Sequence, residues 1–347
     1  MLIFYILLFF LALWGIKFSG KGYYAEESLS RSVTDSVKGV FIWLVFLSHF
    51  SSYATYTSRL DTLGKWISLQ LGQLIVALFL FYSGYGVCEA IKKKGSGYVK
   101  PFPKNRIGKT LIHFDIAVLL FLIIALATGE KPSLTRVALS FVGWDNLGNS
   151  NWYIFDVLVL YAITWISFTI IRKNNRIALL LATVLTLGFI IVLRYTRWSW
   201  WYDTVLCYIL GMWFSFYKEK VLRFLTKNNL LWCGTALVIL VLFGILHFGS
   251  FGLSGLILKP LVFCILVITI LIKFNISNTA LVLSGQYTFE LYILQRIPMI
   301  LLKHFGLADF NIYIYFVSCI VITIALAFIF RRLTNLIDKL LFNKKAL

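Results

Sequence analysis

The chain of 347 residues has few charged residues and few prolines. Only 14% of its residues are charged, whereas 60% are apolar and 17% are aromatic. The scarcity of charge excludes a disordered chain, and five prolines with 23 glycines exclude a collagen-like or proline-rich chain. The apolar excess is larger than one soluble core needs, so the composition predicts an integral membrane protein.

Acidic residues are also few, with 14 Asp and Glu against 33 Lys and Arg, and the formal net charge is +19. In a soluble protein that excess would favour nucleic acid as a partner. Helical membrane proteins collect basic residues in cytoplasmic loops, so we expect contact with membrane lipid and no nucleic acid. The five cysteines show neither C-x-x-C spacing nor a histidine at metal-ligand spacing, so no disulfide framework and no metal site is predicted.

Long apolar runs predict an all-α, polytopic membrane fold with about eleven (ten to eleven) transmembrane helices. The first run has no basic residue before it and no cleavage site of small residues after it, so we expect a retained helix and not a signal peptide. The predicted spans lie at about residues 2–18, 37–57, 66–91, 110–128, 152–171, 177–193, 198–217, 230–248, 256–272, 279–302 and 312–330.

The loops between these spans differ in charge. Of the 33 Lys and Arg residues, 24 fall in one set of alternating segments, and nine fall in the other set or within spans. Because basic residues accumulate on the cytoplasmic side, we expect an outside amino terminus and a cytoplasmic carboxy terminus in the cell membrane. The basic segments are 17–38, 92–109, 172–176, 218–227, residue 273 and the tail 331–345.

The second predicted span contains a lysine and a histidine at helical spacing. Lys38 and His49 are eleven residues apart, which is about three helical turns or roughly 16 Å along one helix face. A polar side chain at membrane depth costs a few kcal/mol or more, so it needs a structural or a functional reason. A histidine packed and hydrogen-bonded to a neighbour would be the structural reason. The basic residue on the same face favours a functional one.

This segment resembles the first-helix signature of the acyltransferase-3 family of multi-pass membrane O-acyltransferases, a basic residue, ten mostly apolar residues and a histidine. The resemblance covers the chain from about residue 36 to the tail. It implies an extra N-terminal helix and loop at 1–36 and an acyltransferase-3-like membrane domain at 37–347. Further segments resemble family motifs in the same order: aromatic Ser-Gly-aromatic at 79–85, Arg-x-x-basic at 106–109, Trp-aromatic at 151–154 and a Gly-containing helix at 208–212.

Three positions depart from the family pattern. Lys38 and Lys109 stand where arginine is expected, which keeps the charge and loses bidentate phosphate geometry. Gln295 stands where a second histidine would be expected. The family likeness implies transfer of an acyl group from cytoplasmic acyl-CoA to a hydroxyl at the other face. We therefore expect an O-acetyltransferase with acetyl-CoA as donor and a glycan, glycolipid or similar acceptor.

On the donor side, Lys38, Arg106 and Lys109 are candidates to bind the phosphates of coenzyme A. Ser83 is a candidate coenzyme contact, although with Gly84 it also suits close helix approach, the commoner role of small residues in membranes. Five further lysines would gather anions at the same mouth, or are an ordinary positive-inside loop or an anionic-lipid contact. These are Lys92, Lys93, Lys94, Lys100 and Lys104.

His49 is the candidate catalytic residue, because an imidazole titrates near neutral pH and can accept and return a proton. The preferred role is general base in direct transfer, and the alternative is a transient acyl carrier. We expect Lys38 and His49 to face one common tunnel.

On the acceptor side, the candidates are Asp156, Trp152, Glu290 and Gln295. Asp156 lies one turn after Trp152, where it would orient His49 or hold an acceptor hydroxyl, or make a buried hydrogen bond to a neighbouring helix. A rival interpretation of the whole chain is a transporter or lipid-linked sugar flippase, whose buried charges would line a permeation path. A scaffold without turnover would leave Lys38 and His49 unexplained.

Overall fold

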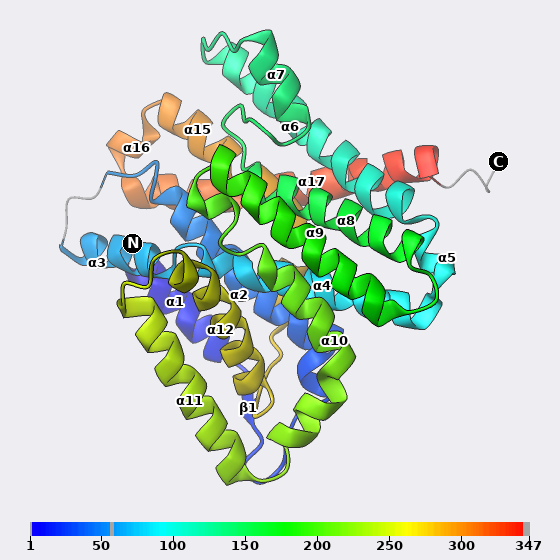
Figure 1. The fold of residues 1–347 in the computed structure, drawn as a ribbon. Coiled ribbons are helices and arrows are strands. Elements are labelled where there is room, and N and C mark those ends of the chain that lie inside the picture. Colours follow the sequence, from blue (N-terminus) through cyan, green and yellow to red (C-terminus); the bar gives the residue numbers. More distant parts are fainter. Residues whose placement is uncertain (1, 56–58, 343–347) are drawn as a thin grey trace.

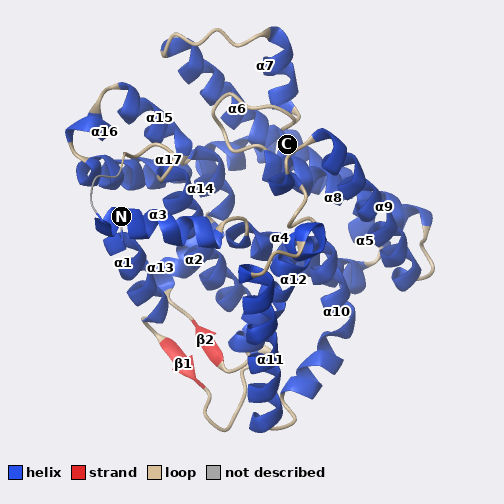
Figure 2. Cartoon of the chain, turned by 60° about the vertical axis from the view of Figure 1, so that its left-hand side comes forward, coloured by secondary structure: helices blue, strands red, loops and turns tan. Residues whose placement is uncertain are grey.

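The computed structural model describes residues 2–55 and 59–342, and the described chain is almost entirely helical (Figures 1 and 2). Eight helices among these residues are long and apolar enough to cross a membrane. They are α2 (Arg31–Phe50), α3 with α4 (Arg59–Leu71 and Leu74–Lys94), η2 with α6 (Pro103–Gly108 and Lys109–Ala127), α8 (Trp152–Ile170), α9 (Asn175–Thr196), α11 (Asn229–Phe248), α12 (Gly252–Leu271) and α17 (Ile312–Phe342).

Shorter or more polar elements connect these helices. A two-stranded antiparallel sheet pairs β1 with β2, with Ile16 opposite Ile276. The elements are α1 (Leu2–Leu13), β1 (Ile16–Phe18), η1 (Glu27–Leu29), α5 (Ser96–Val99), α7 (Leu134–Phe141), η3 (Ser199–Trp201), α10 (Leu206–Leu225), β2 (Phe274–Ile276), α13 (Thr279–Gln286), α14 (Thr288–Leu294), α15 (Arg296–His304) and α16 (Leu307–Phe310).

The all-α class is confirmed, and the predicted count of eleven spans is not. The predicted span 2–18 is a helix only to Leu13, after which the chain enters β1. In the predicted span 198–217, residues 199–201 form the separate short helix η3, and the long helix α10 begins only at Leu206. Helix α10 ends at Leu225, within the basic segment 218–227. The span 279–302 is divided into α13, α14 and α15, because the chain bends near Tyr287 and Gln295.

Two helix pairs approach so closely that only glycine fits between them. A Cβ atom added to Gly84 of α4 would lie 1.9 Å from the carbonyl oxygen of Tyr208, and one added to Gly211 of α10 would lie 2.0 Å from that of Phe81. Small residues at such contacts let membrane helices pack by van der Waals contact. The family-like Gly residues of the sequence therefore bring α4 and α10 together.

Helix α2 packs against α13 in the same way. A Cβ atom on Gly39 would lie 2.0 Å from the carbonyl oxygen of Leu281, and one on Gly285 would lie 1.8 Å from that of Asp35. These two contacts fix the depth of α2 relative to α13, and α2 is the helix that carries Lys38 and His49.

The N-terminal segment is tied to the rest of the chain by a buried lysine. Lys273 is 1% exposed, and its ammonium donates to the carbonyl oxygens of Gly20 (2.8 Å) and Gly22 (2.7 Å) and to Oδ1 of Asn229 (2.7 Å). The same ammonium lies 3.9 Å from the ring centre of Tyr23. The segment that precedes α2 is thus packed against the start of α11.

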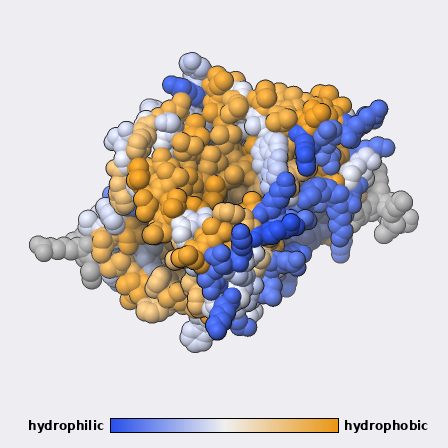
Figure 3. Space-filling model, turned by 60° about the horizontal axis from the view of Figure 1, so that its bottom comes forward, coloured by the Kyte–Doolittle hydropathy of each residue, from blue (hydrophilic) through white to orange (hydrophobic). Residues whose placement is uncertain are grey.

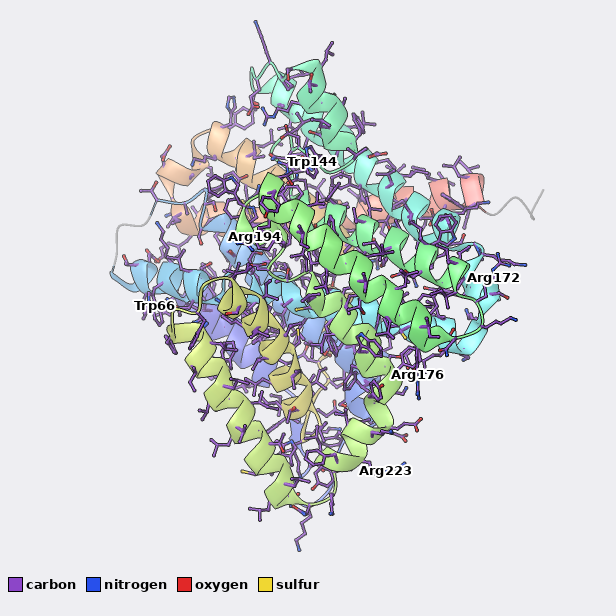
Figure 4. The ribbon with its side chains drawn as sticks, in the orientation of Figure 1. Trp66, Trp144, Arg172, Arg176, Arg194 and Arg223 are labelled. Atoms are coloured by element: carbon purple, nitrogen blue, oxygen red, sulfur yellow. The ribbon has the colours of Figure 1, made fainter. Side chains whose placement is uncertain are left out.

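The surface is apolar over a wide area, and hydrophilic side chains border it (Figure 3). Arg172, Arg176 and Arg223 lie towards one end of the helices, whereas Trp66 and Arg194 lie towards the other (Figure 4). Helix α11 has none of its residues buried, so it is at the periphery. An exposed apolar surface of this kind, which includes many large hydrophobic side chains, fits a membrane protein.

The replacement Gly84→Ala tests the contact between α4 and α10. The added methyl group meets backbone and cannot be accommodated by a side-chain rotation, so we expect a loss of about 1–3 kcal/mol in stability. The thermal unfolding midpoint of the purified protein in detergent should fall.

Gly188→Ala in α9 is the matched control, because nothing lies within 4 Å of a Cβ atom there. It should leave the midpoint unchanged or raise it slightly, since alanine favours helix. Equal midpoints for Gly84→Ala and the wild type would contradict the close contact.

Candidate functional site

Helix α2 places Lys38 and His49 on one face, as the spacing predicts. Its first turn is capped by Ser30, whose side chain accepts a hydrogen bond from the backbone N–H of Val33. Each of the two residues lines a cavity, and the two cavities are different. They are called the Lys38 cavity and the His49 cavity below.

The Lys38 cavity has a volume of about 680 Å³. It is lined by residues from the first half of α2 and from the middle of α4, together with Arg106, Tyr161 and Phe289. The ammonium of Lys38 lies 2.5 Å from Oδ1 of the buried Asp35, one turn earlier in α2. This ion pair holds the lysine at the cavity wall.

Arg106 and Ser83 also line the Lys38 cavity. The Nε group of Arg106 donates to the hydroxyl of Tyr98 (3.0 Å), and the Ser83 and Tyr161 hydroxyls are hydrogen-bonded at 3.0 Å. Three of the four predicted coenzyme contacts therefore lie around one cavity. The alternative role predicted for Ser83 and Gly84, close helix approach, is seen at Gly84, which makes the close contact with α10.

Lys109 differs from the prediction in its location. Its ammonium pairs with Oδ2 of Asp338 in α17 (3.1 Å), and His113 contacts the other oxygen of the same carboxylate (3.1 Å). Lys109 does not line the Lys38 cavity. Lys109 directly follows the short helix η2, which contains Arg106. The two residues have different neighbours, Tyr98 for Arg106 and Asp338 for Lys109.

The five loop lysines 92, 93, 94, 100 and 104 do not line this cavity either. Lys92 bonds Glu89 (2.8 Å), and Lys218 of α10 bonds the second oxygen of the same carboxylate (2.7 Å). Ser215 donates to Glu89 as well (2.6 Å). This cluster joins α4 to α10 beside the Lys38 cavity.

The His49 cavity has a volume of about 320 Å³ and lies at the opposite ends of the same helices. It is lined by the last turn of α2, by the first turn of α4 and by Trp152 at the start of α8. Arg296, at the start of α15, lines it too. His49 therefore faces a cavity and not lipid.

Several polar atoms in the wall of the His49 cavity lack a hydrogen-bond partner within residues 2–55 and 59–342. These buried atoms are Nδ1 of His49, Nδ2 of Asn149, Oγ of Ser150, the hydroxyl oxygen of Tyr292 and Nε of Arg296. A buried polar atom without a partner costs about 1–3 kcal/mol. Five of them around one cavity indicate a site that binds a polar molecule.

The loop that supplies Asn149 and Ser150 is ordered by its own side chains. Oδ1 of Asn149 accepts from the N–H of Leu147 (2.9 Å), and Oδ1 of Asn146 accepts from that of Gly148 (3.1 Å). Asn151 donates to the carbonyl of Gly143 (2.9 Å). The loop was not among the predicted site residues, although a run of Asn, Gly and Ser just before a buried helix is a sequence signal for it.

Arg197 supports this loop from the end of α9. Its guanidinium lies 3.7 Å from the ring centre of Trp144 and 4.6 Å from that of Trp201, and it donates to the carbonyl of Trp144 (2.7 Å). The burial of the guanidinium lowers its pKa from the usual value. Arginine stays charged even so, because its usual pKa is above 12.

The two cavities share the side chain of Tyr292. The Tyr292 ring lies 5.2 Å from that of Tyr153 and 6.2 Å from that of His49, measured between ring centres. Ile42 and Val45 of α2, both 1% exposed, pack in the same cluster. The common tunnel expected from the sequence is therefore divided into two cavities by a wall at Tyr292.

Among the predicted acceptor residues, Trp152 lines the His49 cavity, and Glu290 and Gln295 lie outside it. Glu290 forms two bonds with the guanidinium of Arg331 in α17, at 2.8 and 2.7 Å. Gln295 is 1% exposed, and its amide donates to the carbonyl of Tyr292 (3.1 Å). Both residues therefore support the broken segment α14–α15.

Asp156 is fully buried one turn after Trp152, and neither of its carboxylate oxygens has a hydrogen-bond partner in the described part of the chain. It does not line the His49 cavity. Asp203 interacts with it electrostatically, and burial raises the pKa of Asp203 to about 7. Within the described ranges no group of three or more His, Cys, Asp or Glu side chains is placed to hold a metal ion.

Comparison with known protein families agrees with the motifs. A family model described as an acyltransferase domain, Acyl_transf_3, matches residues 34–332. No curated protein and no solved structure matches the chain. Because the matched region covers most of its length, this protein belongs to the acyltransferase-3 family. The resemblance inferred from Lys38, His49 and the later motifs is confirmed.

The variant Glu290→Gln tests whether Glu290 has a structural role. The variant leaves the Arg331 guanidinium, whose side chain is 26% exposed, without its counter-charge, so we expect a loss of about 1–2 kcal/mol in stability. Thermal unfolding in detergent measures it. The exposed Asp309→Asn should leave the midpoint unchanged. A stable Glu290→Gln protein that had lost its enzymatic activity would instead place Glu290 in a substrate site.

Proposed function

We propose that this acyltransferase is an O-acetyltransferase, which moves an acetyl group from cytoplasmic acetyl-CoA to a hydroxyl of an extracytoplasmic glycan, glycolipid or similar acceptor. The observation that carries the proposal is the arrangement of α2. Its Lys38 lines one cavity, its His49 lines a second, and Tyr292 lies between them. One helix face thus connects a cationic cavity with an imidazole.

The Lys38 cavity suits the donor. Coenzyme A carries several phosphate charges, and Lys38 and Arg106 offer ammonium and guanidinium donors at the cavity wall. The cavity adjoins the end of α4 that carries Lys92, Lys93 and Lys94. Basic residues gather on the cytoplasmic side, which is the side where acyl-CoA is available. Its aromatic lining, which includes Tyr153 and Tyr161, would surround the less polar pantetheine arm.

The His49 cavity suits the acceptor. Nδ2 of Asn149, Oγ of Ser150 and Nε of Arg296 have no hydrogen-bond partner in the described part of the chain, so they could bind the hydroxyls of an acceptor. Trp152 and Trp200 line the same cavity, and aromatic rings of this kind stack on sugars. A hydroxyl compound that enters from the extracytoplasmic face would meet these groups first.

In the proposed reaction, His49 accepts the proton of the acceptor hydroxyl as its oxygen attacks the thioester carbonyl carbon. The new C–O bond forms, and a tetrahedral intermediate carries the negative charge on the former carbonyl oxygen. The C–S bond then breaks, and the thiolate leaving group takes the proton from the imidazolium. The products are an acetyl ester and free coenzyme A, and His49 returns to its neutral form.

The wall at Tyr292 gives the reaction a physical barrier against water. A thioester that enters through the Lys38 cavity would pass Tyr292 on its way to His49, because Tyr292 lines both cavities. A closed wall keeps acetyl-CoA from hydrolysis when no acceptor is bound. Family membership favours this enzymatic function over the transporter interpretation.

The variant His49→Ala tests the catalytic base. General acid–base catalysis contributes about 10²–10⁴-fold, so we expect kcat to fall by that factor. The affinity for acetyl-CoA should not change, because the donor phosphates bind in the Lys38 cavity. The measurement is ester formation from radiolabelled acetyl-CoA in proteoliposomes.

His247→Ala is the control for this variant, since His247 lies in the peripheral helix α11 and bonds Gln70. It should retain transfer. A folded His49→Ala protein with normal product formation would exclude both the base and the acyl-carrier role.

The donor site is tested by the variants Lys38→Gln and Arg106→Gln. Each removes one charge-assisted bond to phosphate, so the Kd for acetyl-CoA should rise roughly tenfold. Lys38→Arg should restore much of the affinity. Equilibrium binding of radiolabelled acetyl-CoA gives these values.

Lys109→Gln removes the same charge outside the cavity and should leave this Kd unchanged. The donor assignment is wrong if Lys109→Gln weakens binding as strongly as Lys38→Gln, or if neither cavity variant weakens it.

A further inference from the structure

A third cavity lies next to the His49 cavity and has a volume of about 470 Å³. Tyr53, Gly148, Ile300 and Lys303 are among its lining residues. Gly148 immediately precedes Asn149 of the His49 cavity, and its carbonyl accepts a bond from Nη1 of Arg296 (3.3 Å). The Arg296–Gly148 contact is therefore the boundary between the two cavities. The third cavity is called the outer cavity below.

Two cations follow one another along a single face of α15. Arg296 and Lys303 are seven residues apart, which is two helical turns and roughly 10 Å. Arg296 lines the His49 cavity and Lys303 lines the outer cavity. The ring of Tyr53 lies between them, because its centre is 5.9 Å from each cationic group. The face leads from the outer cavity to His49.

Neither cation has a carboxylate partner in the described part of the chain. Arg296 makes only the carbonyl bond to Gly148, and its buried Nε has no partner. By contrast, two cations near the carboxyl end of α17 are paired: Arg331 of α17 with Glu290, and Lys109 of α6 with Asp338 of α17. Unpaired cations around a partly enclosed cavity attract an anion.

One carboxylate does line the outer cavity. Glu130 lies there, but its Oε2 atom is 3.6 Å from the guanidinium of Arg136. The counter-charge of Glu130 is therefore Arg136 of α7, and not Arg296 or Lys303 of α15. His304 lines the same cavity as Lys303 and adds a second nitrogen-bearing side chain. The balance of charge in the outer cavity and at Arg296 is positive.

We infer that the acceptor is an anion: a hydroxyl-bearing sugar or polyol that carries a phosphate or carboxylate group. The inference rests on the proposed function, because it takes the His49 cavity as the acceptor site. The anionic group would bind between Lys303 and Arg296 in the outer cavity. A hydroxyl of the same molecule would extend past Arg296 to His49. Asn149 and Ser150 would bind further hydroxyls.

The test is equilibrium binding of radiolabelled glucose 6-phosphate and of glucose to the full chain in phosphatidylcholine nanodiscs. The two probes differ by one phosphate. We expect saturable binding of glucose 6-phosphate with a clear preference over glucose. Lys303→Gln and Arg296→Gln should each weaken binding of the phosphate probe roughly tenfold, so that the preference is largely lost. The variant Lys65→Gln, which removes an exposed lysine of α3, is the control and should keep the preference.

Each outcome is informative. Preference for the phosphate, lost in the two α15 variants and kept in Lys65→Gln, supports the anionic acceptor. Absence of saturable binding, equal binding of both probes, or a preference that survives both variants overturns it. Acetyl-ester formation on the bound sugar is measured separately with acetyl-CoA. Anion binding without any ester formation leaves the anion site standing and contradicts the proposed transfer.

A second arm distinguishes a water-soluble acceptor from a lipid headgroup. Nanodiscs of phosphatidylglycerol present a phosphate and two hydroxyls at the membrane surface. If the acceptor anion is lipid-borne, acetyl-CoA should acetylate this lipid without added sugar, and Lys303→Gln should reduce the rate. If it is water-soluble, only glucose 6-phosphate should be acetylated. Acetylation of glucose in preference to both anions contradicts the inference.

Discussion

Helix α2 carries a cation and an imidazole on one face, and the depth of this helix determines where both act. Its position is set by backbone contact with α13, where Gly39 and Gly285 leave no room for a Cβ atom. Such a contact cannot slide, because any displacement would bring a carbonyl oxygen into the neighbouring helix. Lys38 is thereby held in one cavity and His49 in another, with Tyr292 between them. The proposed division into donor and acceptor sides depends on this geometry.

Much of this arrangement could be predicted from local sequence. Apolar runs predicted the helices, and the eleven-residue spacing placed Lys38 and His49 on one face. The family-like motifs suggested Arg106 and Ser83 as coenzyme contacts together with Lys38, and all three line the Lys38 cavity. The number of spans was less predictable, because a run such as 279–302 has enough apolar residues to span and is nevertheless divided into α13, α14 and α15, which contact α2 and α17. Hydropathy reports composition and does not report where a helix bends.

The rest of the site depends on contacts between distant segments. Tyr292 and Arg296 line the same cavity as His49, although more than 240 residues separate them from it in the sequence. The loop before α8 also lines this cavity, and hydrogen bonds from its backbone N–H groups to its own Asn side chains order it. Lys109 has the right charge and spacing, yet its partner Asp338 lies 229 residues away. The helical period of the sequence predicts the face on which Lys109 lies. The neighbour of that face, Asp338, depends on how α17 packs.

The most direct test is a structure of the full chain in nanodiscs with a thioether analogue of acetyl-CoA that cannot transfer its acyl group. The account predicts the phosphates at Lys38 and Arg106, a displaced Tyr292 ring, and the acyl end of the analogue within hydrogen-bonding reach of His49. An analogue bound with its phosphates away from Lys38, or with its acyl end remaining on the Lys38 side of an unmoved Tyr292, would contradict it.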